Sequence, residues 1–481
     1  MPKSGPMPAS LRRWLSGIAA IACLPLQSPA VNAQIAPAPS TGYNCDLALY
    51  SVPQANLLAR SLQGDTVADQ QYRQLVRELA MELRNCRQQV WPRKMAIWVR
   101  LYSCDLRPGG LDSLFDGLQA LGYNEVFIET FYDGRVLLPA ADNPTVWPSV
   151  VAEPGLERVD LLAEAIRKGR ERGMSVYAWL FTLNYGYSYS QRSDRQDTLA
   201  RNGRSESSLE IVSGGAQVFV DPFNPVARQD YQTLLRSVLS RRPDGVLFDY
   251  VRYPRGTGAA SVMTKVADLL IHTTAARQAW INQLNTPAGQ ALLTEYLDTG
   301  RLSPSDRNQL VLLLGDRLKE LNLRQDVNPL WSLAVYHAWR GVVEFVDEAV
   351  GTVAQAGLPS GAVFFPFGNA RVGQQGWDSR MQPWDRFPNS MEYHPMSYAL
   401  CGDRHDCVMA EVQRVLEAKP NSIVQPAIAG TWGANFNAHL PLEQRMAALR
   451  STFGDRIDRV SHFSLAWMDP QGERQRQRCR L

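Results

Sequence analysis

Eight short apolar runs, most of them separated by segments with helical spacing, constrain the fold of this 481-residue chain more than any other feature. The runs lie at residues 95–102, 125–130, 175–181, 245–251, 361–367, 391–398, 422–429 and 460–467. Segments with helical spacing lie at residues 111–121, 159–172, 226–241, 330–356, 407–418 and 442–453. A repeating strand–helix order predicts an α/β fold with a parallel sheet, because parallel neighbours need a crossover connection, usually a helix.

Eight β/α units over about 370 residues suit a closed (β/α)8 barrel, the TIM barrel, with insertions. An open, doubly wound sheet is the competing architecture, but no GxGxxG motif follows the first predicted strand. We therefore predict a barrel over residues 91–470, preceded by a linker and short helical prefix over 34–90 and followed by a basic tail over 471–481.

The longest interruption of this order follows the fourth predicted strand, at residues 257–328. Its apolar spacing predicts helices at 262–284, 290–297 and 306–321. A segment of this length at the catalytic end of a barrel commonly shapes a binding cleft or a lid. A purely structural elaboration is an equal alternative.

Residues 1–33 have the pattern of a signal peptide. Arg12 and Arg13 precede an apolar stretch at 14–26, and Val31-Asn32-Ala33 offers a small-residue cleavage site. The sequence therefore predicts an exported protein, either periplasmic or secreted. Lipid attachment at Cys23 is the alternative, although Ala20-Ile21-Ala22-Cys23 lacks the usual Leu of a lipobox.

Charge gives little indication of a macromolecular partner. The formal charge of +3 includes Lys3, Arg12 and Arg13, so the chain beyond residue 33 is close to neutral. Without a basic excess there is no electrostatic footprint for nucleic acid, and no nucleic-acid partner is predicted. The arginine-rich run at 474–480 is expected to be a solvated, frayed terminus.

The six cysteines that remain after Cys23 indicate disulfides in an oxidising compartment. Six cysteines allow about 15 connectivities, and the sequence alone does not choose among them. Spacing favours one pair within a loop and one across a helical segment, and elimination then gives the third. The pairs are Cys401–Cys407, Cys45–Cys86 and Cys104–Cys479. Metal binding is the alternative, but neither CxxC nor HxxxH spacing occurs, so we predict no metal site and no cofactor.

The best candidate for chemistry is Asp249, near the end of the apolar run at 245–251. In barrel enzymes the reactive side chains lie at the carboxyl ends of the strands. A carboxylate in so apolar a strand is costly to bury unless it is paired or used. Arg252 is expected to keep Asp249 ionised, and a structural Asp–Arg pair that fixes a loop is the alternative.

Aromatic and short polar residues occupy the other strand ends. Sugar rings present C–H faces that pack on aromatic rings, and hydroxyl groups that need polar partners, so this mixture suits a carbohydrate ligand. Barrel interiors also use Trp and Tyr as core filler. The residues assigned to substrate binding are Asp133, Trp179, Asn184, Arg252, His394, Tyr398, Trp432 and Trp467.

Glycoside hydrolysis normally needs two carboxyl groups with different pKa values, so Asp249 requires a partner. The candidates at strand ends are Glu129, Asp133, Asp221, Glu392 and Asp469. Glu129 and Asp221 are assigned with Asp249 to catalysis. Glu129 equally suits a core hydrogen-bond network, and Asp221 suits a turn before a helix that begins at Asn224-Pro225.

Several ordered segments between Ala96 and Tyr398 resemble the bacterial glycosyl-hydrolase-like 10 family. They are Ile97–Arg100, Asn124–Ile128, Val176–Leu180, Asp221–Pro225, Asp244–Tyr250, Trp339-Arg340 and Pro395–Tyr398. The resemblance implies an exported or lipoprotein barrel that acts on glycans of the cell envelope or matrix. This chain departs from the family pattern at Tyr250, where a second acidic residue often stands, and at Glu129, where Gln or Arg is common.

The predicted function is hydrolysis of O-glycosyl bonds in an envelope or extracellular polysaccharide. A barrel of the cell envelope that binds glycan without cleaving it is the main alternative. Transglycosylation in the same cleft is a third.

Overall fold

The computed structural model describes residues 43, 45–212, 217–323, 326 and 328–479. The predicted signal peptide at 1–33, the alternative lipid site at Cys23 and the linker up to residue 42 lie outside the described residues. Among the residues described, no helix combines the length and the apolar character needed to cross a bilayer.

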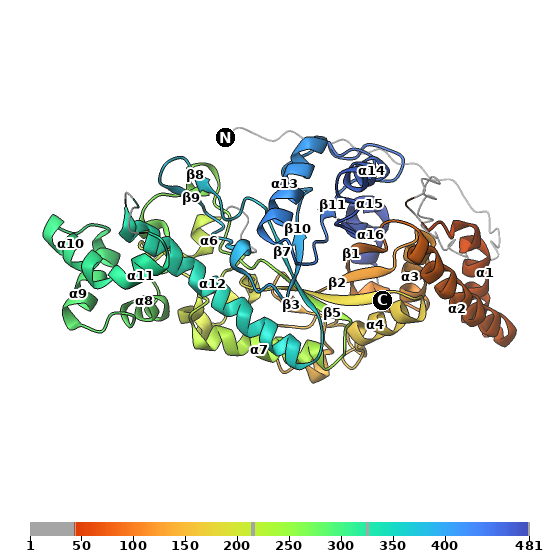
Figure 1. Cartoon of the computed structure of the whole chain (residues 1–481). Helices are drawn as coiled ribbons and strands as arrows, with labels where there is room; N and C mark the ends of the chain where they lie inside the picture. The colour runs from red at the N-terminus through yellow and green to blue at the C-terminus, as the bar shows by residue number, and fades with distance from the viewer. Residues whose placement is uncertain (1–42, 44, 213–216, 324–325, 327, 480–481) are drawn as a thin grey trace, which may run out of the picture. The chain divides into compact units, whose positions relative to one another are not determined.

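Eight parallel strands form a nearly closed barrel (Figure 1), which confirms the predicted fold class and excludes the open sheet. They are hydrogen-bonded in the order β10-β7-β5-β4-β2-β1-β12-β11. Parallel bridges Tyr393–Val424 and Met396–Ala427 join β10 to the segment that contains β11 and nearly complete the ring. The strands are β1 (Lys94–Arg100), β2 (Glu125–Tyr132), β4 (Ser175–Phe181), β5 (Gly245–Asp249), β7 (Ser360–Phe364), β10 (Glu392–Pro395), β11 (Ala427–Ile428) and β12 (Arg459–His462).

The helices predicted between the strands are present. They are α3 (Gly110–Ala120), α4 (Leu161–Glu171), α7 (Pro225–Leu239), α12 (Pro329–Gln355), α13 (His405–Ala418) and α14 (Leu442–Phe453). Between β7 and β10, where no helix was predicted, the described chain contains no α-helix. That connection consists of two short strands and a 3-10 turn, β8 (Arg371–Val372), β9 (Gly376–Asp378) and η7 (Trp384–Arg386).

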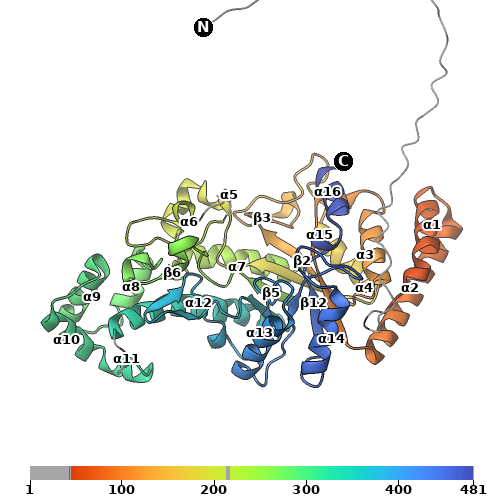
Figure 2. The same cartoon turned by 90° about the horizontal axis from the view of Figure 1, so that it is seen from above.

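The prefix is a pair of helices, α1 (Ser51–Leu62) and α2 (Thr66–Gln89). The Asp65 side chain caps α2 by accepting hydrogen bonds from two backbone amides of its first turn. Figure 2 shows α2 beside α3 and α4. Buried Arg172 links the three helices, because it donates hydrogen bonds to Tyr72 of α2 (2.7 Å) and to Asp116 of α3 (2.6 Å).

The insertion is only partly as predicted. The single helix expected over 262–284 is wrong, since this segment begins with β6 (Val262–Met263), which pairs with β9, and continues through 3-10 turn η6 (Val266–Asp268). The helix α8 (Thr274–Ile281) begins only where the Thr273 side chain accepts a hydrogen bond from an amide of its first turn. Three further helices follow, α9 (Pro287–Thr299), α10 (Pro304–Leu313) and α11 (Gly315–Glu320).

The end of the chain also differs from prediction. The strand expected over 460–467 stops at His462, because Leu465–Met468 forms a helical turn, α15. The tail expected to be frayed is ordered as the helix α16 (Pro470–Arg478). Asp469 caps this helix, and Pro470 occupies its first turn, where the missing N–H has no cost.

The three predicted disulfides are all present. Their Cα–Cα distances are 5.8 Å for Cys45–Cys86, 5.8 Å for Cys104–Cys479 and 5.4 Å for Cys401–Cys407.

Candidate active site

Strand register brings the best candidates to one end of the barrel. Arg100 on β1 pairs with Glu129 on β2, and Glu129 pairs with Trp179 on β4. Two residues beyond Trp179, Phe181 pairs with Asp249 at the end of β5. Paired residues of parallel strands point to the same face, so these side chains share the barrel interior near the carboxyl ends of the strands. Asp249 therefore lies where barrel enzymes place their reactive groups.

Both carboxylate oxygens of Asp249 accept hydrogen bonds. The backbone amide of Tyr250 donates to Oδ1 (2.6 Å), and Nε1 of Trp179 donates to Oδ2 (3.1 Å). Tyr250 has a φ of 52°, a left-handed conformation that bulky residues rarely adopt and that is concentrated at functional sites. Donors on both oxygens stabilise the ionised form of Asp249 and fix its orientation.

Glu129 is bound by Arg100. The guanidinium donates from Nε to Oε2 and from Nη2 to Oε1 (3.0 Å), and its Nη1 contacts Oδ2 of Asp133 at 3.3 Å. The guanidinium carbon lies 4.3 Å from the ring centroid of Tyr132. The pairing of β2 with β4 shifts register directly after Glu129, an irregularity that often re-aims side chains beside active sites.

Burial separates the two carboxyl groups from solvent and raises their pKa values. Asp249 is 6% exposed and Glu129 is 2% exposed. Burial raises the pKa of Asp249 to about 6, against the lowering effects of Tyr250 N–H, Arg252 and Trp179. Burial raises the pKa of Glu129 to about 7, although Arg100 lowers it.

The negative charge of Asp249 also raises the pKa of Glu129, so the two groups lie within range of each other's field. Because β4 separates β2 from β5, the backbones that carry them are about 10 Å apart. The pKa of Glu129 is the higher of the two, which is the order that an acid beside an ionised partner requires.

A group of aromatic rings continues from Trp179 across the barrel. Phe463, directly after β12, lies 6.4 Å from Trp179 and stacks on Tyr398 at 4.4 Å with an interplanar angle of 7°. Trp467 packs edge-on against Tyr398 (5.9 Å) and Phe463 (5.4 Å). We call Tyr398, Phe463 and Trp467 the aromatic wall. The sequence assigned Tyr398 and Trp467 to substrate binding, and the structure brings these two rings together, but Phe463 was not predicted.

The charge of Asp249 and that of Glu129 both act on the hydroxyl of Tyr398, whose pKa is raised well above its ordinary value, mainly by burial. The aromatic wall is therefore close to the carboxylate pair. Arg100 was also missed, although it ends the first strand and the strand-end rule that selected Asp249 applies to it equally.

Both carboxylate oxygens of Asp221 are engaged in a turn, so the structure gives no support to its assignment to catalysis. It is completely buried, its Oδ1 accepts from the amide of Phe223 (2.9 Å), and its Oδ2 accepts from the Thr273 hydroxyl. Both oxygens are thus used to hold the turn before α7 and the start of α8. Asn184 is likewise occupied, since its side-chain oxygen accepts from the amides of Gly186 and Val218.

Five further candidates lie away from the carboxylate pair or serve other roles. Glu392 lies at the amino end of β10, where Arg459 donates to it (3.0 Å), and Asp469 caps α16. His394 is fully buried inside the barrel, 5.6 Å from the ring of Phe127. Arg252 stacks behind Tyr250, 4.5 Å from its ring centroid, and acts on Asp249 only through its charge. Trp432 is half-buried in the turn after β11.

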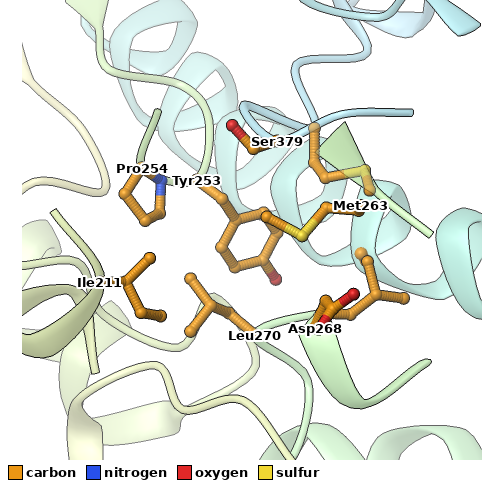
Figure 3. Close-up of a pocket in the computed structure, with 10 residues that line it drawn as sticks. Ile211, Tyr253, Pro254, Met263, Asp268, Leu270 and Ser379 are labelled. Carbon is orange, nitrogen blue, oxygen red and sulfur yellow. The ribbon is translucent and has the colours of Figure 1, made fainter. Parts of the chain in front are cut away.

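A small pocket lies beside the insertion, next to the segment that follows β5 (Figure 3). Its lining includes Tyr253, Met263, Asp268 and Ser379. The free volume of about 10 Å³ is close to the minimum for a single water molecule and excludes a sugar ring. This cavity is therefore not the substrate site.

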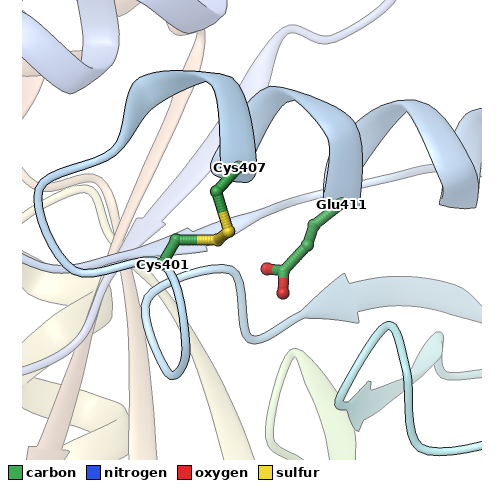
Figure 4. A group of neighbouring side chains, drawn as sticks. All are labelled: Cys401, Cys407 and Glu411. Atoms are coloured by element: carbon green, nitrogen blue, oxygen red, sulfur yellow. A yellow bond between two sulfur atoms is a disulfide. The ribbon is translucent and has the colours of Figure 1, made fainter.

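Cys401, Cys407 and Glu411 form a cluster whose ligand atoms lie within 4.8 Å of one another (Figure 4). Its two sulfur atoms are bonded to each other, so the oxidised cluster offers only one carboxylate. Metal sites in proteins need three or four ligands. The cluster therefore does not form a metal centre in this state.

Comparison with known proteins agrees with this geometry. Residues 107–268, which include β2, β4 and β5, match the model of the family described as glycosyl hydrolase-like 10. The glycosyl hydrolase DigH of Escherichia coli strain K12 is 28% identical over 155 residues, which cover 30% of this chain and 34% of that protein. The match therefore spans about a third of the length of this curated relative.

Among solved structures, the glycoside hydrolase domain of PgaB (BpsB) from Bordetella bronchiseptica superposes with a TM-score of 0.50 and 17% identity. The superposition covers 80% of this chain and 98% of that domain, and it supports the barrel fold. The segment that carries Glu129, Trp179 and Asp249 thus matches the glycosyl hydrolase-like 10 family model, and the described chain adopts the barrel fold that the sequence resemblance predicted.

Proposed function

We propose that this protein hydrolyses O-glycosyl bonds within a polysaccharide, with Glu129 and Asp249 as its two catalytic carboxyl groups. The observation that carries the proposal is the placement of both groups, with pKa values near 7 and 6, on strands β2 and β5 on either side of Trp179. Two carboxyl groups held in different protonation states on opposite sides of a cleft are the usual requirement of glycoside hydrolysis.

Glu129 is the general acid of this proposal. With the higher pKa it retains its proton near neutral pH and delivers it to the glycosidic oxygen as the bond to the anomeric carbon breaks. Asp249 is the ionised group, held by N–H donors from Tyr250 and Trp179. It either attacks the anomeric carbon or takes a proton from the water that does, and the anomeric configuration of the first product distinguishes the two routes.

The aromatic wall is the proposed platform for a sugar ring. Tyr398, Phe463 and Trp467 are each only partly buried, so they present ring surface near the carboxylate pair. Aromatic faces bind the C–H face of a sugar and leave its hydroxyl groups for polar neighbours such as Asp133 and Arg100. The signal-peptide pattern of residues 1–33 supports a substrate outside the cytoplasm, a polysaccharide of the envelope or the extracellular matrix.

The test is the release of reducing ends from envelope and extracellular polysaccharides by the wild type, Asp249→Asn and Glu129→Gln. Each variant should lose about 100-fold to 10,000-fold in kcat, because each removes one acid–base function without changing side-chain shape. Asp458→Asn is the matched control. Its side chain is 58% exposed at the amino end of β12, and it should retain full activity.

A glycan-binding barrel without hydrolysis is the second candidate. It is favoured by one observation, that all four oxygens of Glu129 and Asp249 already accept hydrogen bonds from protein groups. This second function would be established if the wild type binds a polysaccharide but releases no reducing ends from it. The Asp249→Asn variant should then bind that polysaccharide as well as the wild type does. Loss of hydrolysis with retained binding in Asp249→Asn would establish the first.

A further inference from the structure

The C-terminal helix α16 is packed against the loop that leaves β1, 371 residues earlier in the chain. The loop begins directly after Arg100 and contains the 3-10 turn η2 (Ser103–Leu106). Arg476, near the end of α16, is mostly buried in this contact, with 18% of its side chain exposed. A buried guanidinium requires hydrogen-bonding partners, and all of those found for Arg476 belong to the loop, to Arg100 or to its own helix.

Arg476 makes a bidentate ion pair with Asp105. Its Nε donates to Oδ1 (2.8 Å) and its Nη2 donates to Oδ2 (2.9 Å). Asp105 in turn accepts the backbone amide of Tyr102 (2.8 Å), which fixes the turn. Glu473, one helical turn before Arg476, accepts from the Tyr102 hydroxyl and from Arg476 (3.1 Å). The loop is thus fixed by Asp105 from within and by Arg476 and Glu473 from α16.

The same guanidinium reaches the candidate site directly. Nη2 of Arg476 donates to the backbone carbonyl of Arg100 (2.5 Å). Arg100 is the residue whose side chain binds Glu129. One hydrogen bond therefore connects the last helix of the chain to the partner of the proposed general acid.

A covalent bond closes this contact. Cys104 lies in η2, between the two residues that Arg476 and Glu473 hold, and it is bonded to Cys479 at the end of α16. The disulfide keeps α16 beside the loop even when individual hydrogen bonds break.

We propose that α16 is a working part of the active site, in which Arg476 is a positioning residue that holds Arg100 against Glu129 and the Cys104–Cys479 bond holds α16 in place. The proposal rests on the proposed function for the role of Glu129 as an acid. Arg476 does not touch substrate in this scheme. It acts through the backbone of Arg100, whose positive charge opposes the effect of burial on Glu129.

The consequence concerns the alkaline side of the pH–activity profile. A general acid must be protonated, so activity falls as pH rises through its pKa, which is about 7 for Glu129. When Arg476 is lost, Arg100 moves away from Glu129 more often, and the ionised form of Glu129 loses its main stabilising charge. The pKa of Glu129 then rises further, and the alkaline limb moves to higher pH by about one unit.

The first experiment compares the pH dependence of kcat/KM for the wild type, Arg476→Gln, Arg476→Lys and Arg474→Gln. Arg476→Gln should move the alkaline limb up by about one unit and leave the acidic limb of Asp249 in place. Arg476→Lys should restore part of the shift because it keeps the charge. Arg474→Gln makes the same change at an exposed position of α16 and should match the wild type. Activity that falls equally at every pH, with both limbs unmoved, overturns the proposal.

The second experiment does not depend on hydrolysis. The carboxyl carbon of Glu129, labelled with ¹³C and assigned by its loss in Glu129→Gln, is titrated by NMR in the wild type and in Arg476→Gln. A higher pKa in Arg476→Gln supports the positioning role even if no substrate is cleaved, and an unchanged pKa rejects it even if the protein is an active glycosidase.

Removal of Arg476 leaves Asp105 buried without its partner and risks unfolding of the loop. The double variant Cys104→Ser/Cys479→Ser avoids this, because all hydrogen bonds remain possible. It should shift the same limb in the same direction by a smaller amount. A double variant that folds and titrates as the wild type does would contradict the role given to the disulfide.

Discussion

At the scale of single residues, the candidate catalytic side chains were selected by their position near the ends of predicted strands. Asp249 and Glu129 were selected because each lies near the end of a predicted apolar strand, and strand register places both toward the same end of the barrel. Asp221 satisfied the same rule but follows a short bridge, Leu199–Val220, outside the barrel sheet. Sequence spacing does not distinguish a barrel strand from such a bridge, so its carboxylate was assigned to catalysis instead of to a turn.

Arg476 shows a second limit. A run of arginines near a chain end has the composition of a solvated terminus, and local sequence gives no sign that one of them is buried. Its partner, Asp105, is 371 residues away and becomes a neighbour only when β12 returns to β1.

Trp179→Phe tests how Asp249 is kept ionised. The substitution retains a ring but removes the Nε1–H donor to Oδ2, which lowers the pKa of Asp249 in the wild type. The pKa of Asp249 should therefore rise above about 6, so that the acidic limb of the pH–activity profile moves to higher pH and kcat near pH 6 falls by roughly tenfold. The pH dependence of kcat measures both, and an unmoved acidic limb would show that Trp179 does not control Asp249.

Glu411→Gln tests a buried acid outside the active site. Glu411 is 1% exposed, and its Oε2 has no hydrogen-bond partner in the described part of the chain. Burial raises its pKa to about 7 against the opposing charges of Arg380 and Arg404. A raised folded-state pKa contributes stability that is present below the unfolded pKa and is lost as pH rises toward 7.

The free energy of unfolding of the wild type, relative to Glu411→Gln, should therefore fall by roughly 2 kcal/mol between about pH 5 and pH 8, after allowance for solvent screening. Urea unfolding of both proteins at several pH values provides the measurement. A difference that is constant with pH contradicts the raised pKa.

At the scale of elements, strand–helix alternation was predicted well because each element is long enough to show its own hydrophobic period. The errors fall on short elements and on elements set by distant partners. The strand β11 contains only Ala427–Ile428, and β6 exists because it pairs with β9, more than 100 residues later in the chain. The described chain between β7 and β10 contains no α-helix, but the predicted number of barrel strands is still correct.

Asp221→Asn tests how the insertion is attached to the barrel. Asp221 joins the turn before α7 to Thr273, the cap of α8, and the amide replaces one acceptor oxygen by a donor. The free energy of unfolding should fall by about 1 to 3 kcal/mol, and backbone amides at the start of α8 should exchange faster with deuterium.

Hydrolytic activity should fall by less than tenfold in the same variant, because both oxygens of Asp221 are engaged by the Phe223 amide and the Thr273 hydroxyl. Thr273→Val, which removes the hydroxyl at the other end of the contact, should reproduce the faster exchange in α8. A loss of activity as large as that of Asp249→Asn would restore Asp221 to catalysis.

At the scale of the whole molecule, the disulfides constrain loops of very different lengths. Cys401 and Cys407 are separated by 6 residues, and Cys104 and Cys479 by 375. In the chain-entropy description, a longer closed loop restricts the unfolded chain more, which gives about 2 kcal/mol for the short loop and about 6 kcal/mol for the long one.

Replacement of both cysteines by serine in each pair separately should lower the melting temperature in that order, with the larger decrease for Cys104–Cys479. Differential scanning calorimetry of the two double variants measures the ranking. The reverse ranking would mean that the packing lost around each disulfide in the folded protein has a larger effect on stability than the entropy gained by the unfolded chain.

The bond between Cys104 and Cys479 has one more consequence, which follows from where its two ends lie. One end follows the first barrel strand and the other follows the last, and these strands are neighbours, so the barrel sequence is closed into a covalent loop. A protease that cuts once within the helical insertion opens this loop without releasing a fragment. Under denaturing conditions the nicked protein stays in one piece until a reductant separates its halves, and the insertion is thus a natural place for new chain ends in a circularly permuted form.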